Sequence, residues 1–282
     1  MKRFSCTLIA SSVRFITVAT AAFITLTTAS TSHAAVAYGI DGNGNLRLIT
    51  SLGTMSSVIL GSTPFASGGI NVGLAIGPSG QLFAGDAGGN IYSLTPTGIP
   101  TLIGNPGQGP ISGLDWDPTT NRLLAISGGG SPNIFRVSPI TGAVVGPTVP
   151  ASLVGNTPED IAFYAPGQGL VTYRNAGITA VQLIDLATGG LLGTPAVSGV
   201  ADNWTGVDVD NSTGNIYMLG WFDDSWQVSN SAGNLTASHL ATGNHLDWTA
   251  FAISLEVPEP ASAWLIALGC GTTLLRRKRR CI

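Results

Sequence analysis

Tryptophans and carboxylates gather in three short segments of the second half of the chain, residues 202–205, 221–226 and 245–248. Flat indole faces beside carboxylate acceptors suit the apolar faces and the hydroxyl groups of sugar rings. The side chains that could bind such a ligand are Trp204, Trp221, Asp223, Asp224, Trp226, His245, Asp247 and Trp248. The alternative is that the indoles fill a core between packed elements and that the acids cap turns.

Hydrolysis of a polysaccharide would need two carboxylates about 5 to 9.5 Å apart across a cleft. Asp223, Asp224 and Asp247 are the candidates for such a pair, but the sequence does not give their separation. Residues 35–255 contain two histidines, His239 and His245, without zinc-ligand spacing, and they contain no GxSxG elbow, P-loop or dinucleotide fingerprint. We therefore predict no catalytic residue, no metal and no cofactor.

A repeated pattern must position these residues. Five segments alternate small or acidic residues with apolar ones, and they start 40, 47, 46 and 44 residues apart. They are residues 73–76, 113–116, 160–163, 206–209 and 250–253. Alternation of this kind predicts a strand with one face more buried than the other.

Each of the first four segments is followed by a turn rich in Pro, Asn, Asp and Gly, and then by further strands. The second strands are expected at 81–84, 122–126, 170–173 and 215–219, and the third at 90–94, 133–137, 180–184 and 225–228. A turn ending in glycine then leads to a weaker fourth strand. Four strands every 40 to 47 residues is the period of a β-propeller blade.

The two ends of the repeat region complete one further blade. At the start of the repeat region, strands are expected near 37–40, 46–49 and 58–60, and this blade lacks its innermost strand. At the end of the region, residues 250–255 are expected to form an innermost strand that lacks the rest of its blade. Pairing these ends would remove an exposed sheet edge. We therefore predict an all-β fold, a five-bladed propeller closed by its N- and C-terminal strands. A β-sandwich, or six blades with an irregular one near 55–70, are the alternatives.

In a propeller, the loops that precede the first strand and those between the second and third strands open on the same face. The three tryptophan-rich segments occupy such loops in neighbouring repeats, which predicts one shared patch. The rhythm is similar to that of the NHL and WD40-like propeller families, but the Trp-Asp signature of WD40 repeats is absent.

Charge separates the predicted body, residues 35–255, from the ends of the chain. The body has four arginines, no lysine and 13 acidic residues, which gives a net charge of −9. Such a surface excludes nucleic acid as a partner, because binding to phosphates needs a basic patch. The three cysteines, Cys6, Cys270 and Cys281, all lie outside the body, so burial alone must hold it.

The first 34 residues are predicted to be a secretory signal peptide. Lys2 and Arg3 precede an apolar region at about 15–26, and small residues allow cleavage between Ala34 and Ala35. An uncleaved N-terminal anchor, with a signal helix, is the alternative. Export from the cytoplasm follows from either reading.

The tail, residues 256–282, has three features in a fixed order. Val257-Pro258-Glu259-Pro260 comes first, an apolar run of 15 residues at 261–275 follows, and the cations Arg276, Arg277, Lys278, Arg279 and Arg280 close it. Two prolines leave an extended segment. The apolar run is about 22 Å long as a helix, short against a bilayer core of about 30 Å, and the cations should stay cytoplasmic.

This order resembles the PEP-CTERM sorting signal of Gram-negative bacteria. The resemblance implies a transmembrane helix that holds the precursor in the inner membrane, and an exosortase-type enzyme that processes it. It also implies a final location at the cell surface or in an exopolysaccharide matrix. The predicted function is therefore an exported binding or structural protein, with a polysaccharide lyase or glycosidase as the alternative. A plain tail anchor without cleavage is the alternative for the tail.

Overall fold

The predicted repeat is present in the computed structural model, which describes residues 37–65, 72–153, 156–175, 178–197, 204–211, 213–220, 224–243 and 247–253. The predicted signal peptide and its cleavage site at Ala34 and Ala35 lie outside the described residues, as does the tail from Val257 to Arg280. Within the described ranges, no helix is long and apolar enough to cross a membrane.

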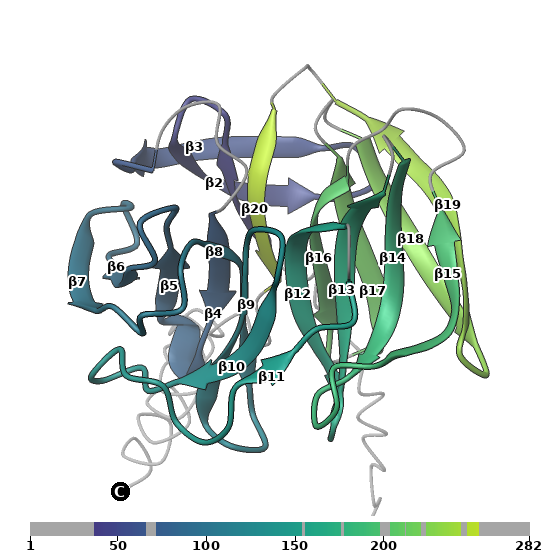
Figure 1. Ribbon diagram of the computed structural model, residues 1–282. Helices are drawn as coiled ribbons and strands as arrows, with labels where there is room; N and C mark the ends of the chain where they lie inside the picture. The colour runs from purple at the N-terminus through teal and green to yellow at the C-terminus, as the bar shows by residue number, and fades with distance from the viewer. Residues whose placement is uncertain are drawn as a thin grey trace, which may run out of the picture. The chain divides into compact units, whose positions relative to one another are not determined.

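The described strands group into five four-stranded units with antiparallel pairing inside each, which we call blades 1 to 5 (Figure 1). A parallel bridge between Thr194 and Asn234 joins blades 3 and 4 into one eight-stranded sheet. Blade 1 is β4 (Gly73–Ile76), β5 (Leu82–Gly85), β6 (Ile91–Leu94) and β7 (Pro100–Gly104). Blade 2 is β8 (Ile111–Asp117), β9 (Arg122–Ser127), β10 (Asn133–Val137) and β11 (Val149–Pro150). Blade 3 is β12 (Thr157–Ala165), β13 (Gln168–Asn175), β14 (Ile178–Asp185) and β15 (Leu191–Val197). Blade 4 is β16 (Trp204–Asp210), β17 (Asn215–Gly220), β18 (Asp224–Ser231) and β19 (Asn234–Thr242).

Blade 5 joins the two ends of the described chain. Its strand order is β20 (Trp248–Ile253), β1 (Ala37–Asp41), β2 (Asn45–Ser51) and β3 (Ser56–Ser62). Ala37 lies opposite Ile253, and Ile40 lies opposite Ala250. The predicted closure by terminal strands is therefore confirmed.

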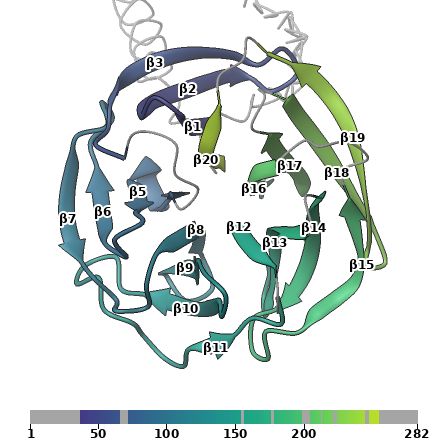
Figure 2. The same ribbon diagram turned by 45° about the horizontal axis from the view of Figure 1, so that its top comes forward.

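The blades surround a common axis, with the first strand of each repeat innermost (Figure 2). The innermost strands contact one another in the cyclic order β4, β8, β12, β16 and β20. Glycines allow this close approach: a Cβ at Gly206 would lie 2.6 Å from the Cβ of Phe251 on β20. The hairpins after these strands use the predicted turn residues, with Asn121 at φ 53° and Gly214 at φ 75°.

The hydrophobic core is divided among the five seams between neighbouring blades. For example, Phe163 of blade 3 packs with Leu124 and Ile126 of blade 2, and Leu183 of blade 3 packs with Val207 of blade 4. The innermost strands are therefore buried on both faces, whereas the alternating pattern predicted that one face would be more buried than the other. Outer strands contribute less to the core. Val58 and Ile59 of β3, Leu102 of β7, and Ile99 just before β7 are all more than half exposed.

Candidate functional site

Two of the predicted ligand-binding tryptophans are core residues. Trp204 and Trp248 are 0% and 1% exposed. Trp204 packs between blades 3 and 4, and Trp248 packs between blades 4 and 5 with Leu219 and Phe251. Because a buried ring cannot stack on a sugar, the prediction of a stacking role is wrong for these two residues, and the alternative of a between-blade core applies to them.

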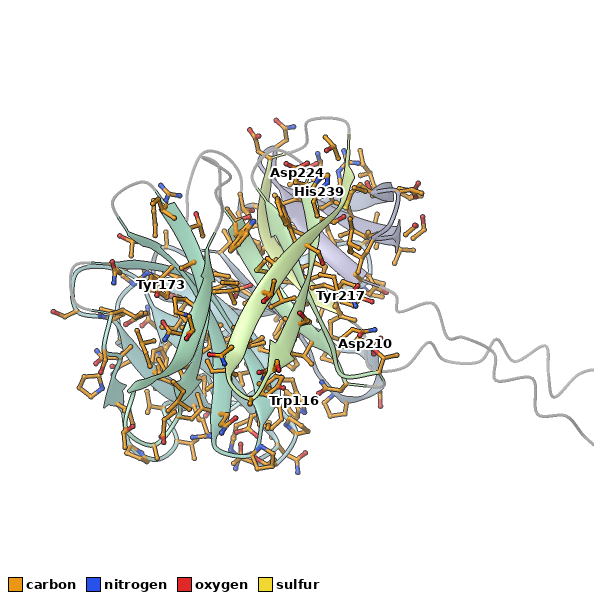
Figure 3. The ribbon with its side chains drawn as sticks, turned by 90° about the vertical axis from the view of Figure 1, so that its right-hand side faces the viewer. Trp116, Tyr173, Asp210, Tyr217, Asp224 and His239 are labelled. Atoms are coloured by element: carbon orange, nitrogen blue, oxygen red, sulfur yellow. The ribbon has the colours of Figure 1, made fainter. Side chains whose placement is uncertain are left out.

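A smaller cluster remains at the surface of blade 4, which we call the β18–β19 cluster: Asp224, Trp226, His239 and Thr242. Trp226 lies opposite His239 in the strand pairing, and their ring centroids are 4.9 Å apart at 70°. Nε2 of His239 lies 3.2 Å from Oδ1 of Asp224 and 3.2 Å from Oγ1 of Thr242. Figure 3 shows Asp224 and His239 side by side at one end of these strands.

The rings form a series that leads from the core to the surface. The centroids of Trp204 and Trp226 are 5.6 Å apart in an edge-to-face arrangement, and Trp226 in turn contacts His239. Trp226 is half-buried, whereas the side chain of His239 is 42% exposed. The exposed imidazole and the neighbouring carboxylate can therefore bond a hydroxyl group of a ligand, with the edge of Trp226 beside them.

The β18–β19 cluster does not have the geometry of a catalytic triad. In a triad, the acid contacts one imidazole nitrogen and the nucleophile contacts the other. Here the carboxylate of Asp224 and the hydroxyl of Thr242 both contact Nε2 of His239. The arrangement suits hydrogen bonding better than nucleophilic catalysis.

The other predicted site residues are Trp221, Asp223, His245 and Asp247. Trp221, Asp223 and His245 lie outside the described residues. Asp247 is exposed, and its carbonyl oxygen accepts a hydrogen bond from the backbone N–H of Gly42 in blade 5. No group of three or more potential metal ligands occurs in the described part of the chain. His239 was not among the residues predicted from the sequence to form the site.

Three of the four arginines of the body neutralise buried carboxylates. Arg47 pairs with Asp41 at 2.6 Å, Arg136 with Asp117 at 2.7 Å, and Arg174 with Glu159 at 3.0 Å. Burial alone would raise the pKa of Asp117, but hydrogen bonds from Thr119 and Arg136 outweigh it and hold the pKa below its ordinary value. Burial raises the pKa of Glu159 to about 7, and the charge of Arg174 only partly opposes this.

Three further carboxylates, those of Asp115, Asp160 and Asp208, are buried on innermost strands. Each accepts a backbone N–H from the next residue of its own strand and another from the next blade. Asp115 accepts from Phe163 at 2.6 Å, Asp160 from Val207 at 3.0 Å, and Asp208 from Ile253 at 2.5 Å. They therefore satisfy donors on the inner edges of β12, β16 and β20 that no further strand reaches.

No known protein family matches the sequence, and no curated protein matches it. Among solved structures, a chain of the nidogen/laminin complex aligns with a TM-score of 0.51 at 12% identity, covering 79% of this chain and 100% of that chain. The fold is that of a β-propeller. The propeller domain of Doa1, a WD40 protein, aligns at 0.44 and 12% identity, covering 79% and 90%. Virginiamycin B lyase from Staphylococcus aureus aligns at 0.43 and 16% identity, covering 70% and 63%.

At these identities the likeness of this β-propeller to the nidogen/laminin chain shows the fold and nothing about ligands. The absence of a family match leaves the PEP-CTERM resemblance of the tail a prediction, resting on the order of its three features.

Proposed function

We propose that the chain is an exported, surface-destined β-propeller that binds a glycan such as the producing organism's exopolysaccharide. In this proposal the apolar run at 261–275 anchors the precursor in the inner membrane, and an exosortase-type enzyme recognises Val257-Pro258-Glu259-Pro260. The observation that carries the sorting role is the order of these features, closed by five cations.

The fold supports this division between body and tail. The last described strand, β20, ends at Ile253, and only residues 254–256 separate it from Val257. All strands needed to close the ring thus precede the tail. Removing the tail should leave the body able to fold, whereas a slightly longer deletion that removes β20 should not.

The sorting role is tested with two truncations of the full chain. Stopping after Glu256 removes the tail alone, and we expect a folded, exported protein that fractionates away from the inner membrane. Stopping after Gly243 also removes β20, leaving β1 without its partner and the inner ring incomplete, so we expect aggregation or degradation. Retention of the first variant in the inner membrane would contradict the anchoring role.

The glycan-binding role is supported by the exposed His239 and by the half-buried edge of Trp226 beside Asp224. His239→Ala should lower retention on the producing organism's exopolysaccharide by about tenfold if the imidazole contacts a hydroxyl, since about 1.4 kcal/mol is tenfold in affinity. Its melting temperature should change little, because the side chain is exposed. Arg122→Ala is a matched control, since it removes a polar side chain from another blade. Unchanged retention of the His239 variant would argue against this patch.

A further inference from the structure

We propose that Asp115, Asp160 and Asp208 form a protonation-dependent joint that holds blades 2 to 5 together and loosens as the pH rises. The three side chains lie on β8, β12 and β16, and each bonds the strand of the following blade. Their exposed fractions are 8%, 2% and 4%. The joint therefore lies in the centre of the ring, away from water.

The geometry of each carboxylate is the same. Oδ1 accepts the N–H of the following residue, namely Trp116, Ile161 or Val209, at 2.6 to 2.8 Å. Oδ2 accepts the N–H of the next blade. The residues bonded across a seam are 48, 47 and 45 positions apart in sequence, so each carboxylate links one repeat to the next.

Among the residues that the structure describes, the surrounding charges do not compensate these carboxylates. The charges that act on them are carboxylates: Asp117 on Asp115, Asp115 on Asp160, and both Asp115 and Asp160 on Asp208. The arginines of the strands nearby have other contacts, because Arg174 pairs with Glu159, Arg136 pairs with Asp117, and Arg122 donates to a carbonyl oxygen. Other titratable groups on the strands packed against the joint are Tyr38, Asp41, Tyr164, Tyr173, Asp185, Asp210 and Tyr217.

Burial without a cation favours the neutral carboxyl form. Burial raises the pKa of Asp115 to about 7, against the opposing hydrogen bonds from Phe163 and Trp116. Burial also raises the pKa of Asp160 and of Asp208 well above its ordinary value, and repulsion from neighbouring carboxylates adds to this. Protonation removes the buried charge, and the neutral carboxyl keeps its carbonyl oxygen and the remaining lone pair of its hydroxyl oxygen as acceptors for the two N–H groups.

The sign of the pH dependence follows from linkage. In the unfolded chain these aspartates ionise near pH 4. In the folded chain the pKa of Asp115 is raised to about 7, and the pKa of Asp160 and of Asp208 is raised well above its ordinary value. Between these values the folded state binds more protons. Their contribution to stability is therefore complete below about pH 4 and is lost as the pH rises through the folded pKa. Most exposed or ion-paired carboxylates act in the opposite direction.

Thermal melts of the full chain in mild detergent at pH 5, 6, 7 and 8 test the joint. We expect the melting temperature of the wild type to fall by about 5 to 10 °C over this range. Asp115→Asn, Asp160→Asn and Asp208→Asn should each flatten the slope. Glu159→Gln measures how much of the slope of melting temperature against pH comes from Glu159, whose pKa is also raised to about 7. Asp185→Asn, at the end of β14 where the carboxylate caps an exposed turn, should run parallel to the wild type.

A second measurement does not depend on whether the variants fold. Carbon-13 NMR of the wild-type chain, labelled at the aspartate carboxyl carbons, should show that Asp115 titrates at about pH 7 and that Asp160 and Asp208 titrate well above the ordinary range of an aspartate. The joint is refuted if all aspartate resonances titrate below pH 5. It is also refuted if the melting temperature is level or rises from pH 5 to 8, or if the three asparagine variants keep the wild-type slope.

Discussion

Replacement of Trp204 by alanine separates a core role from a ligand-binding role most directly. The indole is fully buried and packs against Val181, Leu183 and Val207 in the seam between blades 3 and 4. Truncating a buried tryptophan costs about 3–5 kcal/mol, since the lost contacts leave a cavity. For a body of 221 residues, about 2–4 °C per kcal/mol gives a fall in melting temperature of about 6 to 20 °C.

Two comparison variants make the Trp204 prediction specific. Nε1 of Trp204 is buried without a hydrogen-bond partner, so Trp204→Phe removes an unsatisfied donor that costs about 1–3 kcal/mol. That gain offsets part of the lost volume, and we expect a much smaller fall than for alanine. Trp226→Ala removes a half-buried ring, and it should lower the melting temperature by an amount between those of Trp204→Phe and Trp204→Ala.

The assay is thermal unfolding followed by circular dichroism, run beside retention on exopolysaccharide. We expect Trp204→Ala to melt early and to bind normally at temperatures where it is folded. A melting temperature within 2 °C of the wild type would refute the core assignment. Loss of binding without loss of stability would refute it as well, because it would show that the indole reaches the ligand.

Two further predictions concern a turn and a seam. Asp117→Asn should destabilise the chain by about 2–3 kcal/mol at pH 7, because Arg136 loses its ionised partner. The pKa of Asp117 is lowered in the folded state, and such a group adds stability only while its carboxylate is ionised. The difference in stability from the wild type should therefore shrink as the pH falls below about 4. Urea unfolding at pH 3 and pH 7 measures this, and an equal difference at both would contradict it. Gly142→Ala should cost about 1–3 kcal/mol, because Gly142 has φ 68° and a Cβ there would lie 2.6 Å from the Cα of Gly104. Gly130→Ala, where a Cβ meets open space, is its control, and equal urea midpoints for the two would be inconsistent with a close seam.

The fold could be predicted because its signals are local. The alternating segments and the turns between them lie within one repeat, and the repeat recurs at a near-constant spacing. Closure by β1 and β20 followed from counting strands at the two ends. The predicted strands 73–76 and 133–137 match β4 and β10 at both ends, and most others differ by one to three residues.

The sequence left open whether Trp204 and Trp248 are buried or bind a ligand, because the strands begin earlier than the pattern indicated. The alternating pattern starts at Gly206 and Ala250, but β16 and β20 start two residues before these glycine and alanine positions. The strand pairing skips one residue in each, Thr205 and Thr249, so these are bulges. A bulge changes which face the preceding side chain occupies, and the alternation does not reveal it.

His239, by contrast, could have been placed from the sequence. Ala232 and Gly233, with φ of 54° and 88°, form a two-residue turn between Ser231 and Asn234. Counting back along both strands from such a turn pairs Trp226 with His239. The carboxylates of Asp115, Asp160 and Asp208 could not have been placed in this way, because their partners lie a full repeat away.

The distribution of those carboxylates makes the five seams unequal. Carboxylates bridge the seams from blade 2 to 3, 3 to 4 and 4 to 5. In the repeat, Ala75 of blade 1 and Ala252 of blade 5 occupy the position that Asp115 and Asp208 occupy in blades 2 and 4. Both alanines are buried in apolar surroundings. The two seams of blade 1 therefore rest on apolar packing, whose strength does not depend on a protonation state. Alkaline pH should weaken the three bridged seams and leave blade 1 attached to both of its neighbours.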